Sequence, residues 1–254
     1  MSFLVDTLWL TAIFMIAVRI GPLFVMTPVL GTAEIPVRVR VFLALAFAVA
    51  LASVAGAASS APLSSIGAFI AAAVSELVIG IAMVFGVFAA FGAFLFGGRL
   101  LDIQIGFGIA NVFDPITRAQ GPLIGTALNL LAVAVFFAVD GHHMLLRGIA
   151  YSLTRFPPGR PLTDLQLAAV VEQFGVVFAY GLMIVAPAVI ILLLLDVGLA
   201  IAARTMPQMN VFIVAMPLKV VVGLLTLALS MRYLAPAFDR VFESIGVYWH
   251  KLFN

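Results

Sequence analysis

Few residues of this chain could do chemistry, and those that could lie inside or beside long apolar segments. Glu76 and Lys219 are ionisable side chains within apolar stretches. Such residues are costly in a membrane and are therefore functional candidates. Lys219 is expected to face either an acidic partner or a wet pore, and Glu76 has the same status. Alternatively, Pro217 ends its apolar segment early and the Lys219 side chain reaches the membrane interface. We interpret Asp196 and Arg204 as structural.

Two adjacent histidines, His142 and His143, follow Asp140 and suggest a metal site. Neighbouring helical residues point about 100° apart, however, and the only other histidine is His250. We therefore expect polar anchoring at a membrane boundary, with Asp140 and Gly141 ending one helix, and no bound metal.

Enzymatic chemistry is not expected. The sequence has no G-x-S-x-G serine, no P-loop and no H-E-x-x-H motif. The absence of cysteine excludes disulfides and thiolate chemistry. No basic run indicates nucleic-acid binding, and no cofactor is implied.

The elements that position these residues must be membrane helices. The chain is 65% hydrophobic and 9% charged, whereas soluble domains carry about 25% charged residues. We expect an all-α membrane protein with a single domain, 1–254. Apolar stretches near the ~20 residues that span a bilayer are Leu8–Pro28, Val41–Ala58, Ile66–Gly98, Gly121–Val139, Phe174–Leu195 and Val211–Met231.

Several details suggest that these are not simple spans. Ile66–Gly98 is too long for one crossing, so it is expected to tilt, break or protrude. Gly80, Gly86 and Gly92 within it favour tight helix packing. Prolines inside the segments predict kinked helices or half-length hairpins. Arginine and lysine in the connections, including a polar loop predicted at Arg155–Gln173, give no consistent orientation.

The segment Gly106–Pro122, GFGIANVFDPITRAQGP, is apolar yet too rich in glycine and proline for a long helix. Lipid cannot satisfy the backbone of such a segment, so it must be buried in protein or line a cavity. We predict that it is a plug in a conduit. The plug residues are Gly106, Phe107, Gly108, Ile109, Val112 and Phe113. A buried connector is the alternative.

Four stretches of the sequence resemble the FliR family of flagellar and type III secretion export-gate proteins. They are Arg19 to Arg40, Gly106 to Pro115, Leu128 to Leu130 followed by DGHH at Asp140 to His143, and Met206 to Lys219. The resemblance covers nearly the full length. The DGHH and GFGIANVFDP stretches look more flagellar than injectisome.

The resemblance implies a channel-forming subunit of the export gate in the bacterial inner membrane, at the flagellar basal body. It implies kinked helices and hairpins that assemble with FliP-like and FliQ-like subunits and other export components. The loop at 106–122 would help to close the channel to all but unfolded export substrates. We assign partner contacts and assembly to the region of Arg38 and Arg40 and to Met206, Gln208, Asn210 and Lys219.

Two other functions remain open. One is an injectisome export-gate homologue. The other is a small secondary transporter that uses Glu76 and Lys219, although the halves of the chain show no convincing repeat.

Overall fold

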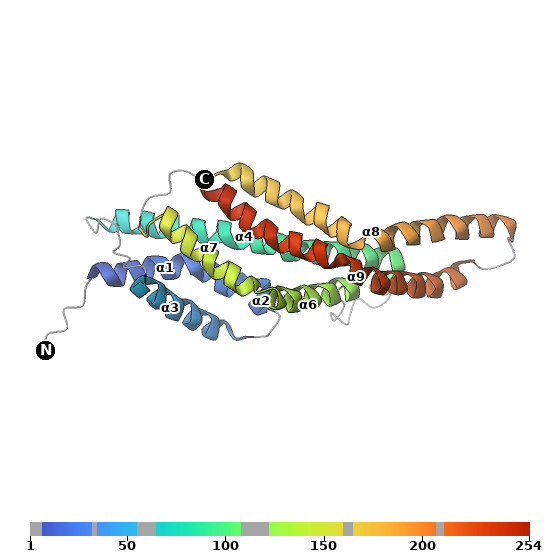
Figure 1. Ribbon diagram of the computed structural model, residues 1–254, viewed down its shortest axis with the longest axis horizontal. Coiled ribbons are helices and arrows are strands. Elements are labelled where there is room, and N and C mark those ends of the chain that lie inside the picture. The colour runs from blue at the N-terminus through green and yellow to red at the C-terminus, as the bar shows by residue number, and fades with distance from the viewer. Residues whose placement is uncertain (1–6, 32–34, 55–64, 108–121, 160–164, 207–210) are drawn as a thin grey trace. The chain divides into compact units, whose positions relative to one another are not determined.

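The computed structural model describes residues 7–31, 35–54, 65–107, 122–159, 165–206 and 211–254. These residues form helices and short connections with no β-strand, which confirms the all-α prediction (Figure 1). The helices are α1 (Thr7–Met26), α2 (Pro28–Gly31), α3 (Val37–Val54), α4 (Ile66–Ile105), α6 (Leu123–Ala138), α7 (Gly141–Arg155), α8 (Leu167–Thr205) and α9 (Val211–Phe253).

Among the described residues, four helices are long and apolar enough to cross a membrane: α1, α4, α8 and α9. The number becomes five if α6 and α7, separated by a short break, form one broken span. Within the described residues, the core of each predicted apolar stretch is helical, although Leu8–Pro28 crosses from α1 into α2. α4 continues for 40 residues without the break considered for Ile66–Gly98, and α8 and α9 run through Pro187, Pro217 and Pro236.

The predicted polar loop Arg155–Gln173 is wrong at its second half, because α8 begins at Leu167. Tertiary contacts explain this early start. The carboxylate of Glu172 forms an ion pair with Lys251 Nζ at 2.5 Å. The side-chain amide of Gln173 donates a hydrogen bond to the backbone carbonyl of Gly86 in α4 at 3.4 Å. These partners stabilise polar helical turns that look like a loop in the sequence.

The helix α9 extends 22 residues past the predicted end at Met231, to Phe253 (253 − 231 = 22). Its second half is amphipathic rather than uniformly apolar. Buried residues recur there at the three- and four-residue spacing of one helical face: Phe238, Val241, Phe242, Ile245, Tyr248, Trp249 and Leu252. A prediction based on continuous apolar residues therefore places the end of this helix too early.

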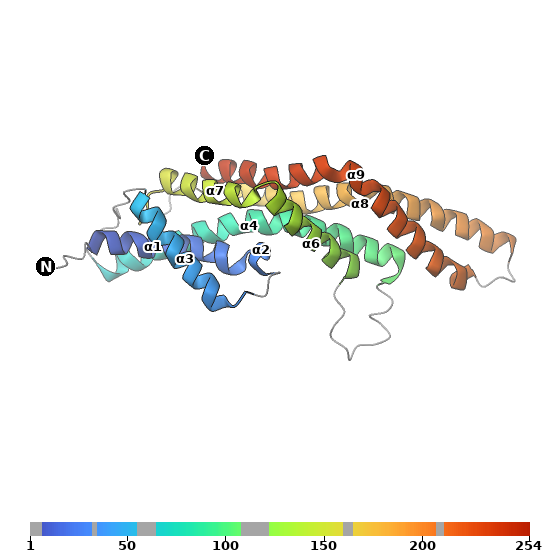
Figure 2. The ribbon, with the colours of Figure 1, turned by 60° about the horizontal axis from the view of Figure 1, so that its bottom comes forward.

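The chain divides into two compact units. The first comprises residues 1–89, 140–173 and 244–254, and the second comprises residues 90–139 and 174–243. In the first unit, α1 packs on α3 (Figure 2). Phe24 and Phe47 meet across this contact with ring centroids 5.2 Å apart.

A buried ion pair lies in the first unit. The Nε of Arg19 on α1 donates to Glu76 on α4 at 2.5 Å, and both side chains are buried. Arg19 also donates to the carbonyl oxygens of Ser152 and Phe156, each at 2.8 Å. The second carboxylate oxygen of Glu76 accepts the backbone N–H of Gly159 at 2.8 Å. Because every partner is satisfied, the network ties α1, α4 and the end of α7 together.

Glycines let backbones approach closely in both units. A Cβ atom added to Gly80 would lie within 3.0 Å of the Arg19 backbone, and one added to Gly86 would meet the Tyr248 ring at 2.5 Å. Tight packing at these two positions is confirmed, whereas Gly92 makes ordinary contacts. In the second unit, a Cβ on Gly97 would lie 2.6 Å from the Gly181 carbonyl oxygen, so α4 and α8 touch through their backbones.

Candidate functional site at the base of the 106–122 loop

The predicted plug loop leaves the second unit at the end of α4. Ile105 is the last residue of that helix, and Gly106 follows with a φ of 100°, a left-handed conformation that suits glycine. The Gly106 N–H donates to the carbonyl oxygens of Asp102 and Ile103, both at 3.2 Å. Phe107 is half-buried in a short turn after it. The left-handed glycine and its two hydrogen bonds therefore terminate α4 after Ile105.

The loop returns at the start of α6, where Pro122 is the N-cap residue. Proline supplies no side-chain hydrogen bond, so the first N–H groups of α6 need another acceptor. Asp102, from α4, provides it. Its Oδ1 accepts from the Ile124 N–H at 3.0 Å, and its Oδ2 accepts from the Gly125 N–H at 3.2 Å. The buried carboxylate also faces the positive end of the α6 dipole.

A glycine contact brings the same two helices together. A Cβ atom on Gly98 would lie 2.3 Å from the Cα of Gly125, so no side chain fits between α4 and α6 at this point. Ile105 also packs against Gly223 of α9, where an added Cβ would meet the Cδ1 of Ile105 at 2.6 Å. Both ends of the loop are thus fixed on a packed base. We call residues 98–107 and 122–125 the loop base.

Only part of the predicted plug lies within the described residues. Gly106 and Phe107 belong to the loop base. Gly108, Ile109, Val112 and Phe113 lie outside the described residues, so their place in a conduit stays a prediction. The loop base positions a hydrophobic segment but supplies no nucleophile, and its one acid, Asp102, is occupied by backbone hydrogen bonds.

The two predicted assembly arginines differ in their surroundings. Arg40 donates from Nε to the carbonyl of Ile35 and from Nη1 to the carbonyl of Val25, both at 2.9 Å. It therefore holds the connection from α1 to α3 within the first unit. Arg38, in the first turn of α3, has an exposed side chain that is accessible to a partner.

Lys219 has an acidic partner within its own chain. Its Nζ lies 2.5 Å from an oxygen of Asp196, and the two side chains are 22% and 39% exposed. Asp196 therefore forms an ion pair within the chain, in keeping with the structural role that we expected for it. The alternative in which Pro217 ends the segment is wrong, because α9 continues through it.

The remaining predicted assembly residues, Met206, Gln208 and Asn210, fall in the sequence between the end of α8 and the start of α9. Met206 is exposed just after α8. Gln208 and Asn210 lie outside the described residues.

Asp140, His142 and His143 come closer together than their sequence positions suggested. One ligand atom of each lies within 4.8 Å of the others, and the two imidazole centroids are 4.2 Å apart. Asp140 is the N-cap residue of α7, with a φ of 57° and no capping hydrogen bond from its side chain, and its carboxylate lies 3.4 Å from the His143 ring nitrogen Nδ1. A cation here would oppose the positive helix end. The group lies at the break between α6 and α7, so polar anchoring at a boundary stays our prediction.

Sequence reasoning missed Asp102 and the partner of Glu76. Asp102 is an isolated acid near the end of a long apolar stretch, and α6 begins with Pro122 and no capping side chain. Those two facts together are a signal that an acid elsewhere caps α6. Arg19 and Glu76 are 57 residues apart, and only packing joins them.

Comparison with known proteins places this chain in a family. The family described as bacterial export proteins, family 1, matches residues 10–245. The flagellar biosynthetic protein FliR of Bacillus subtilis (strain 168) is 32% identical over 236 residues, covering 91% of this chain and 90% of that protein. FliR of Escherichia coli (strain K12) is 29% identical over 238 residues, covering 93% and 90%.

A further relative is named for a secretion system. The secretion system apparatus protein SsaT of Salmonella typhimurium is 30% identical over 160 residues, covering 62% of each chain. None of these three relatives is named as an enzyme. An apolar all-helical chain, matched along nearly its whole length, belongs to the FliR family of bacterial export proteins.

Proposed function

We propose that the chain, acting as one domain, is a channel-forming subunit of the flagellar type III protein export gate in the inner membrane, at the basal body. It assembles with FliP-like and FliQ-like subunits, and its 106–122 loop closes the passage until an unfolded substrate enters. The FliR proteins of Bacillus subtilis and Escherichia coli match along about 90% of both chains, whereas SsaT matches along 62%, and this supports the flagellar over the injectisome assignment.

The loop base is the observation that carries the plug proposal. A plug must be fixed at both of its ends, while the segment between those ends must be able to move. Asp102 and the contact between Gly98 and Gly125 hold the ends together. Phe107 stands at the first of these ends, and Ile109, Val112 and Phe113 lie in the segment between them. A narrow ring of such side chains excludes water and therefore ions.

The exposed apolar faces support assembly with other chains. In the most apolar window of α4, 61% of residues are buried, but the corresponding shares for α8 and α9 are only 22% and 11%. The ion pair of Lys219 and Asp196 interrupts these exposed faces. Because charges are costly against lipid, partner helices are better suited than acyl chains to cover this region.

The secondary-transporter function has no observation in its favour. Glu76 is bound by Arg19 and Gly159 in the first unit. Lys219 is bound by Asp196 in the second unit. Both candidate charges already have partners within their own units.

Native mass spectrometry of the particle extracted in mild detergent from the cells that make this chain tests the assembly. We expect the chain to leave the membrane in a complex with FliP-like and FliQ-like subunits. Extraction as a lone monomer under conditions that keep other membrane complexes intact would contradict the proposal.

A further inference from the structure

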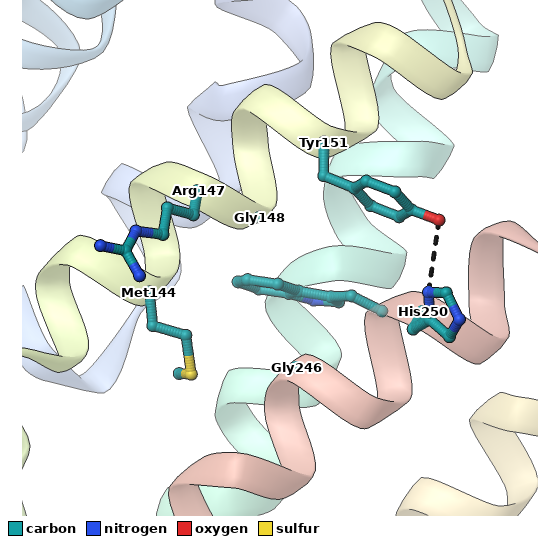
Figure 3. Close-up of a pocket in the computed structure, with 7 residues that line it drawn as sticks. Met144, Arg147, Gly148, Tyr151, Gly246 and His250 are labelled. Carbon is teal, nitrogen blue, oxygen red and sulfur yellow. Dashed lines mark hydrogen bonds between the residues drawn. The ribbon is translucent and has the colours of Figure 1, made fainter.

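A groove in the first unit lies between α7 and the last turns of α9 (Figure 3). Its volume is about 250 Å³, and it is lined by Met144, Arg147, Gly148, Tyr151, Gly246, Trp249 and His250. We propose that this groove binds an anionic phospholipid, with the headgroup phosphate at Arg147 and part of one acyl chain beside Trp249.

The apolar wall of the groove is preformed. A Cβ atom on Gly148 would lie 1.9 Å from the Trp249 ring, so the indole packs directly against the backbone of α7. The indole Nε1 donates to the Met83 carbonyl at 3.0 Å, which fixes the ring. A Cβ atom on Gly246 would meet nothing within 4 Å. The open space therefore exists because position 246 carries no side chain.

The groove has a cationic end and a hydrogen-bonded end. Met144 and Arg147 lie at one end in Figure 3, and Tyr151 and His250 lie at the other. The Tyr151 hydroxyl and His250 Nδ1 are 3.4 Å apart. Arg147 is exposed and has no hydrogen bond or ion pair with any described residue. A guanidinium without a partner is well suited to a phosphate, which it binds through two parallel hydrogen bonds.

Among the described residues of this region, Arg147 is a cation that remains available. Lys251, on the neighbouring turn of α9, is paired with Glu172 at 2.5 Å. Arg155, at the end of α7, donates to the Phe253 carbonyl at 3.1 Å. An incoming anion would therefore complete the coordination of Arg147 without displacing an existing contact.

The size and setting of the groove favour a lipid. Sites for drug-sized solutes have volumes of roughly 300–1,000 Å³, so about 250 Å³ suits a section of one acyl chain. α7 is amphipathic, and His143, Arg147, Tyr151 and Arg155 follow one another at four-residue spacing on one face. Basic and aromatic residues on such a face are typical of helices at a membrane surface.

Quenching of Trp249 fluorescence by brominated lipid tests the proposal. The chain has two tryptophans, so the Trp9→Phe variant reports on Trp249 alone. The full chain is reconstituted in vesicles of phosphatidylcholine and phosphatidylglycerol, with bromine on the acyl chains of one lipid at a time. Brominated phosphatidylglycerol is expected to quench at a roughly five-fold lower mole fraction than brominated phosphatidylcholine, the effect of one well-placed arginine.

Two variants separate the headgroup from the acyl chain. Arg147→Gln should make the two brominated lipids equally effective, whereas Arg240→Gln, which removes an exposed charge of the second unit, should preserve the preference. Gly246→Leu fills the groove and should weaken quenching by both lipids. Gly175→Leu is its control, because a Cβ there also meets nothing within 4 Å.

Three results would overturn the proposal. Equal quenching by the two lipids in the parent would mean ordinary surrounding lipid. Quenching that Gly246→Leu leaves unchanged would place the acyl chain outside the groove. A photoreactive residue at position 144 that captures a protein chain in the native particle, rather than a lipid, would assign the groove to a partner subunit.

Discussion

Two ion pairs of the same length serve different purposes in the two units. Arg19 and Glu76 pair at 2.5 Å in the first unit, where both side chains are buried and every hydrogen bond is made within the chain. Lys219 and Asp196 also pair at 2.5 Å, in the second unit, but 22% and 39% of their side chains remain exposed.

The difference lies in the surroundings of the pairs. The first pair is enclosed by its own unit, so it contributes to the stability of that unit and is not accessible to a partner. The second interrupts apolar helix faces whose large side chains are exposed: Ile190, Leu193, Leu194, Val197, Val221 and Leu225. We therefore expect the first pair to control stability and the second to control association with partner helices.

The largest effect is expected from Glu76→Gln. It leaves the charge of Arg19 buried without its counterion, which costs about 3–5 kcal/mol. Thermal unfolding of the purified chain in detergent measures this loss. Glu172→Gln is the matched control, because that carboxylate also pairs at 2.5 Å but is 63% exposed. Equal destabilisation by the two variants would remove the distinction between enclosed and exposed pairs.

A smaller effect is expected from Asp102→Ala at the loop base. It removes the acceptor of the Ile124 and Gly125 N–H groups, and the loss of a helix cap costs about 1–2 kcal/mol. Hydrogen exchange at these two amides should accelerate about ten-fold or more. Asp239→Asn, at an exposed position of α9, should leave them protected. Unchanged protection in Asp102→Ala would show that packing at Gly98 alone holds the base.

The smallest effect on the stability of the chain is expected from the double variant Lys219→Gln and Asp196→Asn. Partly exposed pairs contribute about 0–1 kcal/mol. Recovery of partner subunits in the detergent-extracted particle should nevertheless fall, whereas Arg204→Gln should preserve it. Full recovery with the double variant would mean that this face does not contact a partner.

The helical fold was predictable because apolar runs of about 20 residues leave little choice in a membrane. The ends of the helices were not. The first turns of α8 are polar, and only contacts such as Glu172 with Lys251 show that they are helical. The second half of α9 follows a one-sided pattern, whereas the predicted segments were defined by continuous hydrophobicity.

The sequence singles out 106–122 as a candidate segment, but the geometry of its base could not be predicted. Its glycine, proline and phenylalanine residues predict a buried irregular loop, of which the structure describes only the two ends. Asp102 has no local partner, since the N–H groups that it binds lie 22 and 23 residues further along the chain. Contacts of this kind depend on the packing of Gly98 against Gly125, which no local pattern encodes.

The central claim is that apolar side chains of the 106–122 loop keep the export channel closed to ions, and single-particle conductance in planar bilayers tests it most directly. The assembled particle carrying Phe107→Gly and Phe113→Gly should conduct ions at rest, because its hydrophobic constriction is widened and wetted. The variant with leucine at both positions keeps an apolar ring and should stay closed. Equal, negligible conductance of the glycine variant, the leucine variant and the parent would contradict the account.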